Sequence, residues 1–174
     1  MAATVSLMTQ FPPEGAPEHV SLADYLPYQL VVAANAVTRL VSRAYEDRFG
    51  LSIPQWRLMS VLAEGPLTQQ AAVVRTAMDK VRVSRAAQDL VERRLAVRLS
   101  NRVDRRSHSL ELTAAGRRLF AEIVPLARAY EAALLAGLAP SEVATLKRLL
   151  GQLESAAGTL YGADTAPPVP GRAE

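Results

Sequence analysis

The chain has 174 residues, of which 49% are hydrophobic, enough for one domain with a substantial core and short extensions. It contains no cysteine, which excludes disulfides, cysteine-ligated zinc and any catalysis or redox sensing through a thiol. The formal net charge is only +3, but the segment from Arg75 to Arg106 holds ten basic and four acidic residues, a local balance of +6. Such a concentration indicates a polyanionic partner; a solvated helix face in an arginine-rich protein is the simpler alternative.

The two ends of the chain are predicted to be flexible. Residues 1–20 contain Pro12, Pro13, Gly15 and Pro17 and predict a flexible arm, and residues 162–174 predict a disordered tail. The longest apolar-leaning stretch without charge, residues 25–38, is shorter than the roughly 20 residues that a membrane span requires. No secretory signal is visible at the N-terminus. We therefore expect a cytoplasmic protein with no membrane association.

Helices are predicted for most of the first half of the chain. Apolar residues recur every three or four positions over residues 22–48, which indicates a long amphipathic helix that Gly50 ends. A second helix has Pro54 in its first turn and stops at Gly65. Thr68 is expected to cap a short third helix over residues 69–76.

A fourth helix and a ribbon are predicted next. Asp79 is a favourable N-cap for the fourth helix, whose buried stripe contains Val83, Ala86, Ala87 and Leu90. The pattern then changes to a period of two over residues 96–100 and again over residues 109–112. Two strands joined by a long charged loop are therefore expected.

Two further helices complete the predicted domain. One begins near residue 114 and extends to about residue 135 with Pro125 inside it, and the last begins at Pro140. The last helix carries an apolar stripe that is wide for a chain end, with Leu146, Leu149, Leu150 and Leu153 at helical spacing. A partner surface is expected to cover this stripe.

The run from Leu67 to Leu119 resembles the MarR family of bacterial transcriptional regulators. Leu67-Thr68-Gln69-Gln70 is similar to the start of the family's support helix, and Asp79-Lys80, Val83-Ser84-Arg85 and Leu90 are similar to its recognition helix. The wing pattern D-x-R-x-x-x-L-x-L-T-x-x-G is matched by Asp104, Arg106, Leu110, Leu112, Thr113 and Gly116. The sequence departs from the family at Arg94, where glycine is usual, and at Val81 and Arg82, where small hydroxylic residues are common.

The resemblance implies a mainly α fold with a small β-ribbon. A winged helix-turn-helix over about residues 53–113 would be flanked by dimerisation helices over about residues 22–49 and 114–161, within one MarR-like domain over residues 21–161. These long apolar helices exceed what a small winged domain needs, so a homodimer is expected rather than a monomer in which they cover their own core.

Double-stranded DNA with a pseudo-palindromic operator is the expected partner. With Val83, Ala87 and Leu90 turned inward, the outer face of the fourth helix would enter the major groove. Arg82 is predicted to recognise a guanine and Val81 a thymine methyl. Arg102, Arg105 and Arg106 of the wing would reach the minor groove, with Asp104 orienting Arg106. The predicted contacts, phosphate-binding residues included, are Thr68, Gln69, Gln70, Lys80, Val81, Arg82, Ser84, Arg85, Gln88, Arg102, Asp104, Arg105 and Arg106.

A small-molecule effector is implied by the resemblance, because related regulators bind an aromatic acid or phenol, and some an acyl-coenzyme A thioester, between the dimerisation helices and the winged domain. The candidate residues are His19, Tyr25, Tyr28, Arg39, Arg43, Trp56, Arg57 and Tyr130. Each of the aromatic residues is equally compatible with an ordinary core or surface position.

Three alternatives to a ligand-responsive regulator are an enzyme, a winged-helix module that binds protein or nonspecific DNA, and a DNA-binding protein without an effector. No catalytic motif, metal site or cofactor site is visible, so an enzyme is not expected. A winged-helix module that binds DNA or protein without an effector is the main rival to a ligand-responsive repressor. Whether the protein represses or activates depends on where its operator lies, which the sequence does not record.

Overall fold

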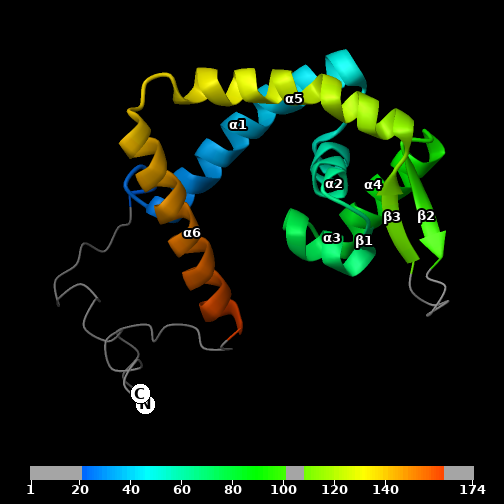
Figure 1. Ribbon diagram of the computed structural model, residues 1–174. Helices are drawn as coiled ribbons and strands as arrows, with labels where there is room; N and C mark the ends of the chain where they lie inside the picture. The colour runs from blue at the N-terminus through cyan, green and yellow to red at the C-terminus, as the bar shows by residue number, and fades with distance from the viewer. Residues whose placement is uncertain (1–20, 101–107, 163–174) are drawn as a thin grey trace, which may run out of the picture. The chain divides into compact units, whose positions relative to one another are not determined.

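A computed structural model describes residues 21–100 and 108–162 (Figure 1). In this part of the chain the predicted fold class is confirmed: helices dominate, and a small antiparallel sheet accompanies them. The elements, in chain order, are α1 (Leu26–Phe49), α2 (Ile53–Ala63), β1 (Leu67–Thr68), α3 (Gln69–Thr76), α4 (Lys80–Glu92), β2 (Ala96–Ser100), β3 (His108–Leu112), α5 (Ala114–Leu135) and α6 (Pro140–Gly162).

The chain divides into two compact units at Phe120, inside α5. The first unit contains α1 to β3 and the start of α5, and the second contains the rest of α5 and α6. No helix within the described residues combines the length and the apolar character that crossing a bilayer demands.

The first helix starts later than predicted. We expected it from Leu22, but residues 22–24 form turns and the helix begins at Leu26, with Pro27 in its first turn. Proline suits this position because its fixed φ matches the helix and its missing N–H has no partner there in any case. The predicted end is confirmed, because Gly50 adopts the left-handed conformation at φ 60° and its N–H donates to the Glu46 carbonyl at 3.0 Å.

The sheet has one more strand than predicted. Leu67 and Thr68 form β1, which pairs with Leu110 and Ser109 of β3, so the strand order is β1-β3-β2. A strand of two residues is too short to show a period-two pattern, so no sequence pattern indicates it. The ribbon itself is confirmed, with Ala96 opposite Leu112 and Ser100 opposite His108. Its second strand begins at His108, one residue earlier than expected.

The core of the first unit lies between α2, α4 and the sheet. Leu58, Met59 and Leu62 of α2 are fully buried, as are Val83 and Leu90 of α4. Leu110 and Leu112 of β3 are also buried. The inner stripe of the fourth helix is therefore confirmed, and its burial leaves the opposite face of α4 free for a partner.

The threonine and glycine of the wing motif hold α5 against the start of β2. The Thr113 hydroxyl donates to the Arg94 carbonyl at 2.8 Å and accepts the Gly116 N–H at 3.0 Å. A Cβ at Gly116 would overlap the Leu95 carbonyl oxygen, so only glycine permits this approach. Arg94 has φ 59°, which confirms that the left-handed geometry persists without the usual glycine.

Candidate nucleic-acid interface

The helices α3 and α4 form a helix-turn-helix. Thr68 caps α3, because its hydroxyl accepts the Ala71 N–H at 3.2 Å, as predicted. Ala77 turns the chain in the left-handed conformation at φ 51°, and the buried Met78 anchors the turn. The left-handed conformation of Ala77 was not predicted, since the chain has no glycine or asparagine at this turn to indicate it.

Asp79 caps α4 as predicted and also engages the side chain of Arg82. Its Oδ1 accepts the Arg82 N–H at 2.8 Å, and its Oδ2 lies 3.2 Å from the Arg82 Nε. The start of the helix is thus fixed by a single carboxylate, whose negative charge also suits the positive end of the helix dipole.

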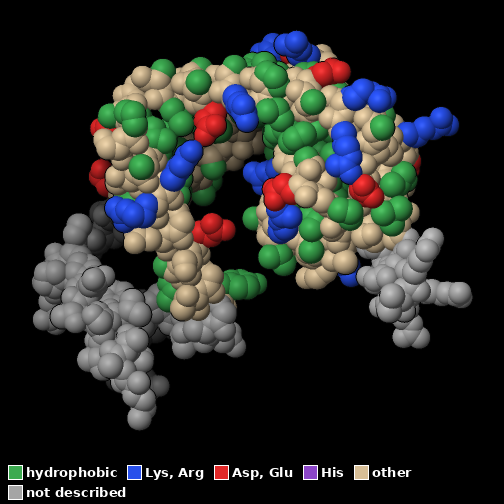
Figure 2. Space-filling model, in the orientation of Figure 1, with side chains coloured by type: hydrophobic (Ala, Val, Ile, Leu, Met, Phe, Trp, Pro, Cys, Tyr) green, Lys and Arg blue, Asp and Glu red, His purple; other side chains and the backbone are tan. Residues whose placement is uncertain are grey.

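The predicted contact residues of the helix-turn-helix lie on one unit and are accessible to a ligand. Lys80, Val81, Arg82, Arg85 and Gln88 are exposed on α4, whereas Ser84 is half-buried. Thr68 and Gln70 are exposed at the start of α3, and Gln69 is half-buried. Among the described residues Arg85 has no ion pair, while Gln88 donates to Glu92 at 2.9 Å. Basic side chains on the visible face of this unit are coloured blue in Figure 2.

The wing is described only at its base. Arg98 on β2 is paired in register with Leu110 and, with Gln69 and Ala87, lines a small hollow of about 60 Å³. This arginine was not among the predicted contacts, although it belongs to the basic segment of the sequence. The predicted wing residues Arg102, Asp104, Arg105 and Arg106 lie outside the described residues.

Two polar links fix α4 against the rest of the first unit. The Gln55 amide donates to Asp89 Oδ2 at 2.9 Å, while its oxygen accepts the Ser52 N–H at 3.0 Å. The Arg93 guanidinium donates to the carbonyls of Gly50, at 2.8 Å, and Phe49, at 3.1 Å. Neither link was predicted. Ser52-x-x-Gln55 is a recognisable capping box, but no local pattern marks the contact of Arg93.

The candidate effector residues of the first unit form two groups. Tyr25 and Tyr28 lie exposed at the start of α1, whereas Trp56 is half-buried beside Tyr45, with ring centroids 5.1 Å apart. Tyr28 and Tyr45 are 17 positions apart on α1. The helical rise of about 1.5 Å per residue therefore puts the two groups about 25 Å apart. Trp56 also stacks on Phe120 at 5.4 Å. Tyr45 and Phe120 were not among the predicted residues.

Three of the five remaining candidate effector residues are exposed arginines. Arg39, Arg43 and Arg57 are exposed, and Arg43 pairs with Asp47 across 3.8 Å on the surface of α1. Tyr130 is half-buried in the second unit, and His19 lies outside the described residues.

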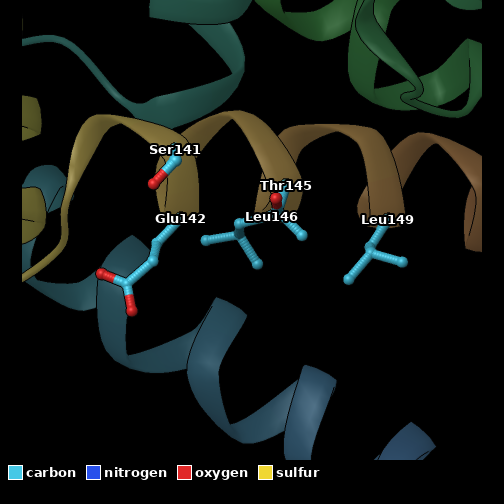
Figure 3. A pocket seen from close by; sticks show the side chains of 5 residues that line it. All are labelled: Ser141, Glu142, Thr145, Leu146 and Leu149. Atoms are coloured by element: carbon cyan, nitrogen blue, oxygen red, sulfur yellow. The ribbon is translucent and has the colours of Figure 1, made fainter.

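The long helices expose apolar faces. Leu26, Val32, Val37 and Leu40 of α1 each have at least 42% of their surface exposed, and the predicted stripe of α6 is exposed to a similar degree. A hollow of about 330 Å³ on α6 is lined by Ser141, Glu142, Thr145, Leu146 and Leu149, which project from one side of the helix (Figure 3). Another of about 340 Å³ lies over the start of α1, beside Tyr28 and Val32.

Three consecutive helices, α2, α3 and the capped α4, are followed by the antiparallel ribbon of β2 and β3. This order defines a winged helix-turn-helix protein. A family model described as the MarR family matches residues 49–107, which contain most of this winged helix-turn-helix. The resemblance to the MarR family seen in the sequence is confirmed for this part of the chain.

Solved structures of regulators match most of the chain. A MarR/EmrR family transcriptional regulator from Acinetobacter sp. ADP1 is 26% identical with a TM-score of 0.76, covering 80% of this chain and 99% of that one. NadR in complex with 4-hydroxyphenylacetate is 26% identical with a TM-score of 0.64, covering 82% and 97%. MepR of S. aureus in a complex with DNA has a TM-score of 0.69 at 20% identity, covering 76% and 98%, and so shares the fold. No curated protein matches the sequence.

Proposed function

We propose that this protein is a homodimeric transcriptional regulator that binds a pseudo-palindromic operator in double-stranded DNA. The observation that carries the proposal is the outer face of α4: Lys80, Arg82 and Arg85 are exposed on a helix whose opposite face is buried and whose start is capped by Asp79. A rigid helix with exposed cationic side chains fits the major groove of B-DNA. The MepR–DNA complex supports the proposal at the level of the fold.

The contacts divide by their chemistry. Arg82 donates to a guanine and the exposed Val81 packs against a thymine methyl, which select sequence. Lys80, Arg85 and the hydroxyls of Thr68 and Ser84 bind phosphates, which orient the protein without selecting sequence. The glutamines at 69, 70 and 88 border this surface. In the wing, the arginines at 102, 105 and 106 would approach the adjacent minor groove, with Asp104 orienting Arg106.

The operator test uses the full chain and the DNA upstream of its own gene, in a mobility-shift titration at several salt concentrations. Specific binding should survive competitor DNA, and Arg85→Ala should lower the slope of log affinity against log salt by about one. Arg148→Ala, on α6 and outside the helix-turn-helix, removes the same charge and should leave the slope unchanged. A chain that ignores duplex DNA at low salt would refute the proposal.

A small aromatic acid or phenol, or its coenzyme A thioester, is proposed as the effector that releases the operator. The 4-hydroxyphenylacetate complex of NadR supports this class of ligand, and the ring stack of Trp56 with Phe120 offers an aromatic wall within the first unit. Thermal unfolding across such acids and thioesters should reveal a stabilising ligand, and that ligand should weaken the mobility shift. Stabilisation by none of them would favour the alternative, a winged-helix module without an effector.

A further inference from the structure

A single carboxylate holds both the backbone and the side chain of Arg82. Asp79 Oδ1 accepts the Arg82 N–H at 2.8 Å, while Oδ2 faces the Nε of the same residue at 3.2 Å. The N-cap of α4 needs only the first of these contacts. The second is an additional ion-pair contact, which favours orientations of the guanidinium that keep its Nε beside Asp79.

The contact leaves one particular edge of Arg82 available. A guanidinium can present either its Nε edge or the edge formed by its two terminal nitrogens, and the Asp79 carboxylate lies beside the Nε. The terminal edge carries parallel N–H donors that match O6 and N7 of guanine. We infer that Asp79 is a positioning residue that sets the preference of Arg82 for guanine, an inference that rests on the proposed function.

Exposure explains why the contact acts on recognition rather than on folding. The side chains of Arg82 and Asp79 are 71% and 57% exposed, and ion pairs so open to water contribute little to stability. On DNA the pair would be dehydrated, and an arginine already held in one orientation loses less freedom on binding. The carboxylate also repels phosphates, so it should weaken non-specific binding while it sharpens the choice of base.

The decisive substitution is Asp79→Asn. Asparagine caps helices as well as aspartate does, so the fold should be retained, but its neutral amide cannot form the ion pair with Arg82. Asp79→Ser, another good cap, serves as a second variant if asparagine lowers the thermal midpoint. Binding is measured to the operator and to duplexes with each single base change across one half-site, with a random duplex as the non-specific reference.

The expected result has two opposite parts. Asp79→Asn should lower the preference for guanine at one operator position roughly tenfold, while affinity for the random duplex stays the same or rises. Arg82→Ala should abolish the preference at that same position. The double substitution should lose no more than Arg82→Ala alone, because the two residues act through one contact.

The matched control is Glu92→Gln, which makes the same change of charge near the other end of α4, where Glu92 contacts Gln88. It should leave the guanine preference intact. An undiminished preference for guanine in both Asp79 variants would overturn the inference. So would a loss of preference confined to a cytosine at another position, because Asp79 would then contact a base itself. A wild-type protein with no preference among duplexes would instead refute the proposed function.

Discussion

Arg94 occupies a backbone conformation that suits glycine. Its φ of 59° lies in the left-handed region, where a Cβ costs about 1 kcal/mol, yet its N–H and carbonyl both serve the junction between α4 and β2. Arg94→Gly should therefore raise the free energy of unfolding by about 1 kcal/mol, measured by urea denaturation. Arg94→Ala is the control, because it removes the same side chain but keeps the Cβ. An equal rise in the free energy of unfolding in both variants would mean that loss of the side chain, not relief of the backbone conformation, causes the effect.

Gly116 should tolerate no larger residue. A Cβ there would overlap the backbone oxygen of Leu95 and approach the Leu112 side chain, and backbone cannot move aside as a flexible side chain can. Gly116→Ala is expected to lower the free energy of unfolding by about 3 kcal/mol, as in severe overpacking. Gly137→Ala, where nothing lies within 4 Å, should change it by less than about 0.5 kcal/mol. Thermal and chemical denaturation of both variants would check this.

At the scale of elements, Gln55 joins α2 to the recognition helix. Its oxygen completes the capping box of α2 and its nitrogen bonds Asp89 of α4, so each end of one amide has a separate task. The Arg93 link joins the end of α4 to the end of α1 differently, through a charged side chain that donates to helix-terminal carbonyls. These links determine how the recognition helix is held in its unit.

Replacing the Gln55 amide with a carboxylate should break only its bond to Asp89. Gln55→Glu keeps an acceptor for the Ser52 N–H but sets two carboxylates against each other, so the free energy of unfolding at neutral pH should fall by about 2 kcal/mol. Adding Asp89→Asn removes the repulsion and restores a donor, and most of the loss should be recovered. Denaturation curves of the single and double variants make the comparison. Without such a recovery, the link between α2 and α4 would not be what holds them together.

At the scale of the whole molecule, the exposed apolar faces of α1 and α6 support the proposed homodimer. Leu150 is 44% exposed on the stripe of α6, and an apolar stripe of this kind usually belongs to an interface. Leu150→Glu should shift sedimentation at micromolar concentration toward the monomer and weaken operator binding at least tenfold, since one half-site alone then remains engaged. Ser155→Glu adds the same charge on the opposite side of α6 and should leave the mass unchanged. A wild-type monomer would contradict the dimer outright.

The sequence by itself predicted every helix, the ribbon and the caps at Thr68 and Asp79. These features depend on local physics: apolar residues at helical or alternating spacing, and short polar side chains that accept the first free N–H groups of a helix. The inward stripe of α4 could be predicted for the same reason, and with it the residues left on the outer face. Within the described residues, the starts of α1 and β3, the left-handed turn at Ala77 and the two-residue strand β1 departed from these local predictions.

Tertiary structure alone decided how these elements are joined. The bonds of Arg93 to Gly50 and of Gln55 to Asp89 connect residues 43 and 34 positions apart, and no local pattern encodes such a distance. The packing of Gly116 against Leu95 likewise follows from the approach of two backbones, although the motif marks the glycine. The pairing of Asp79 with the Arg82 side chain depends on the rotamer that the folded chain selects, because i and i+3 residues on a helix can meet but need not.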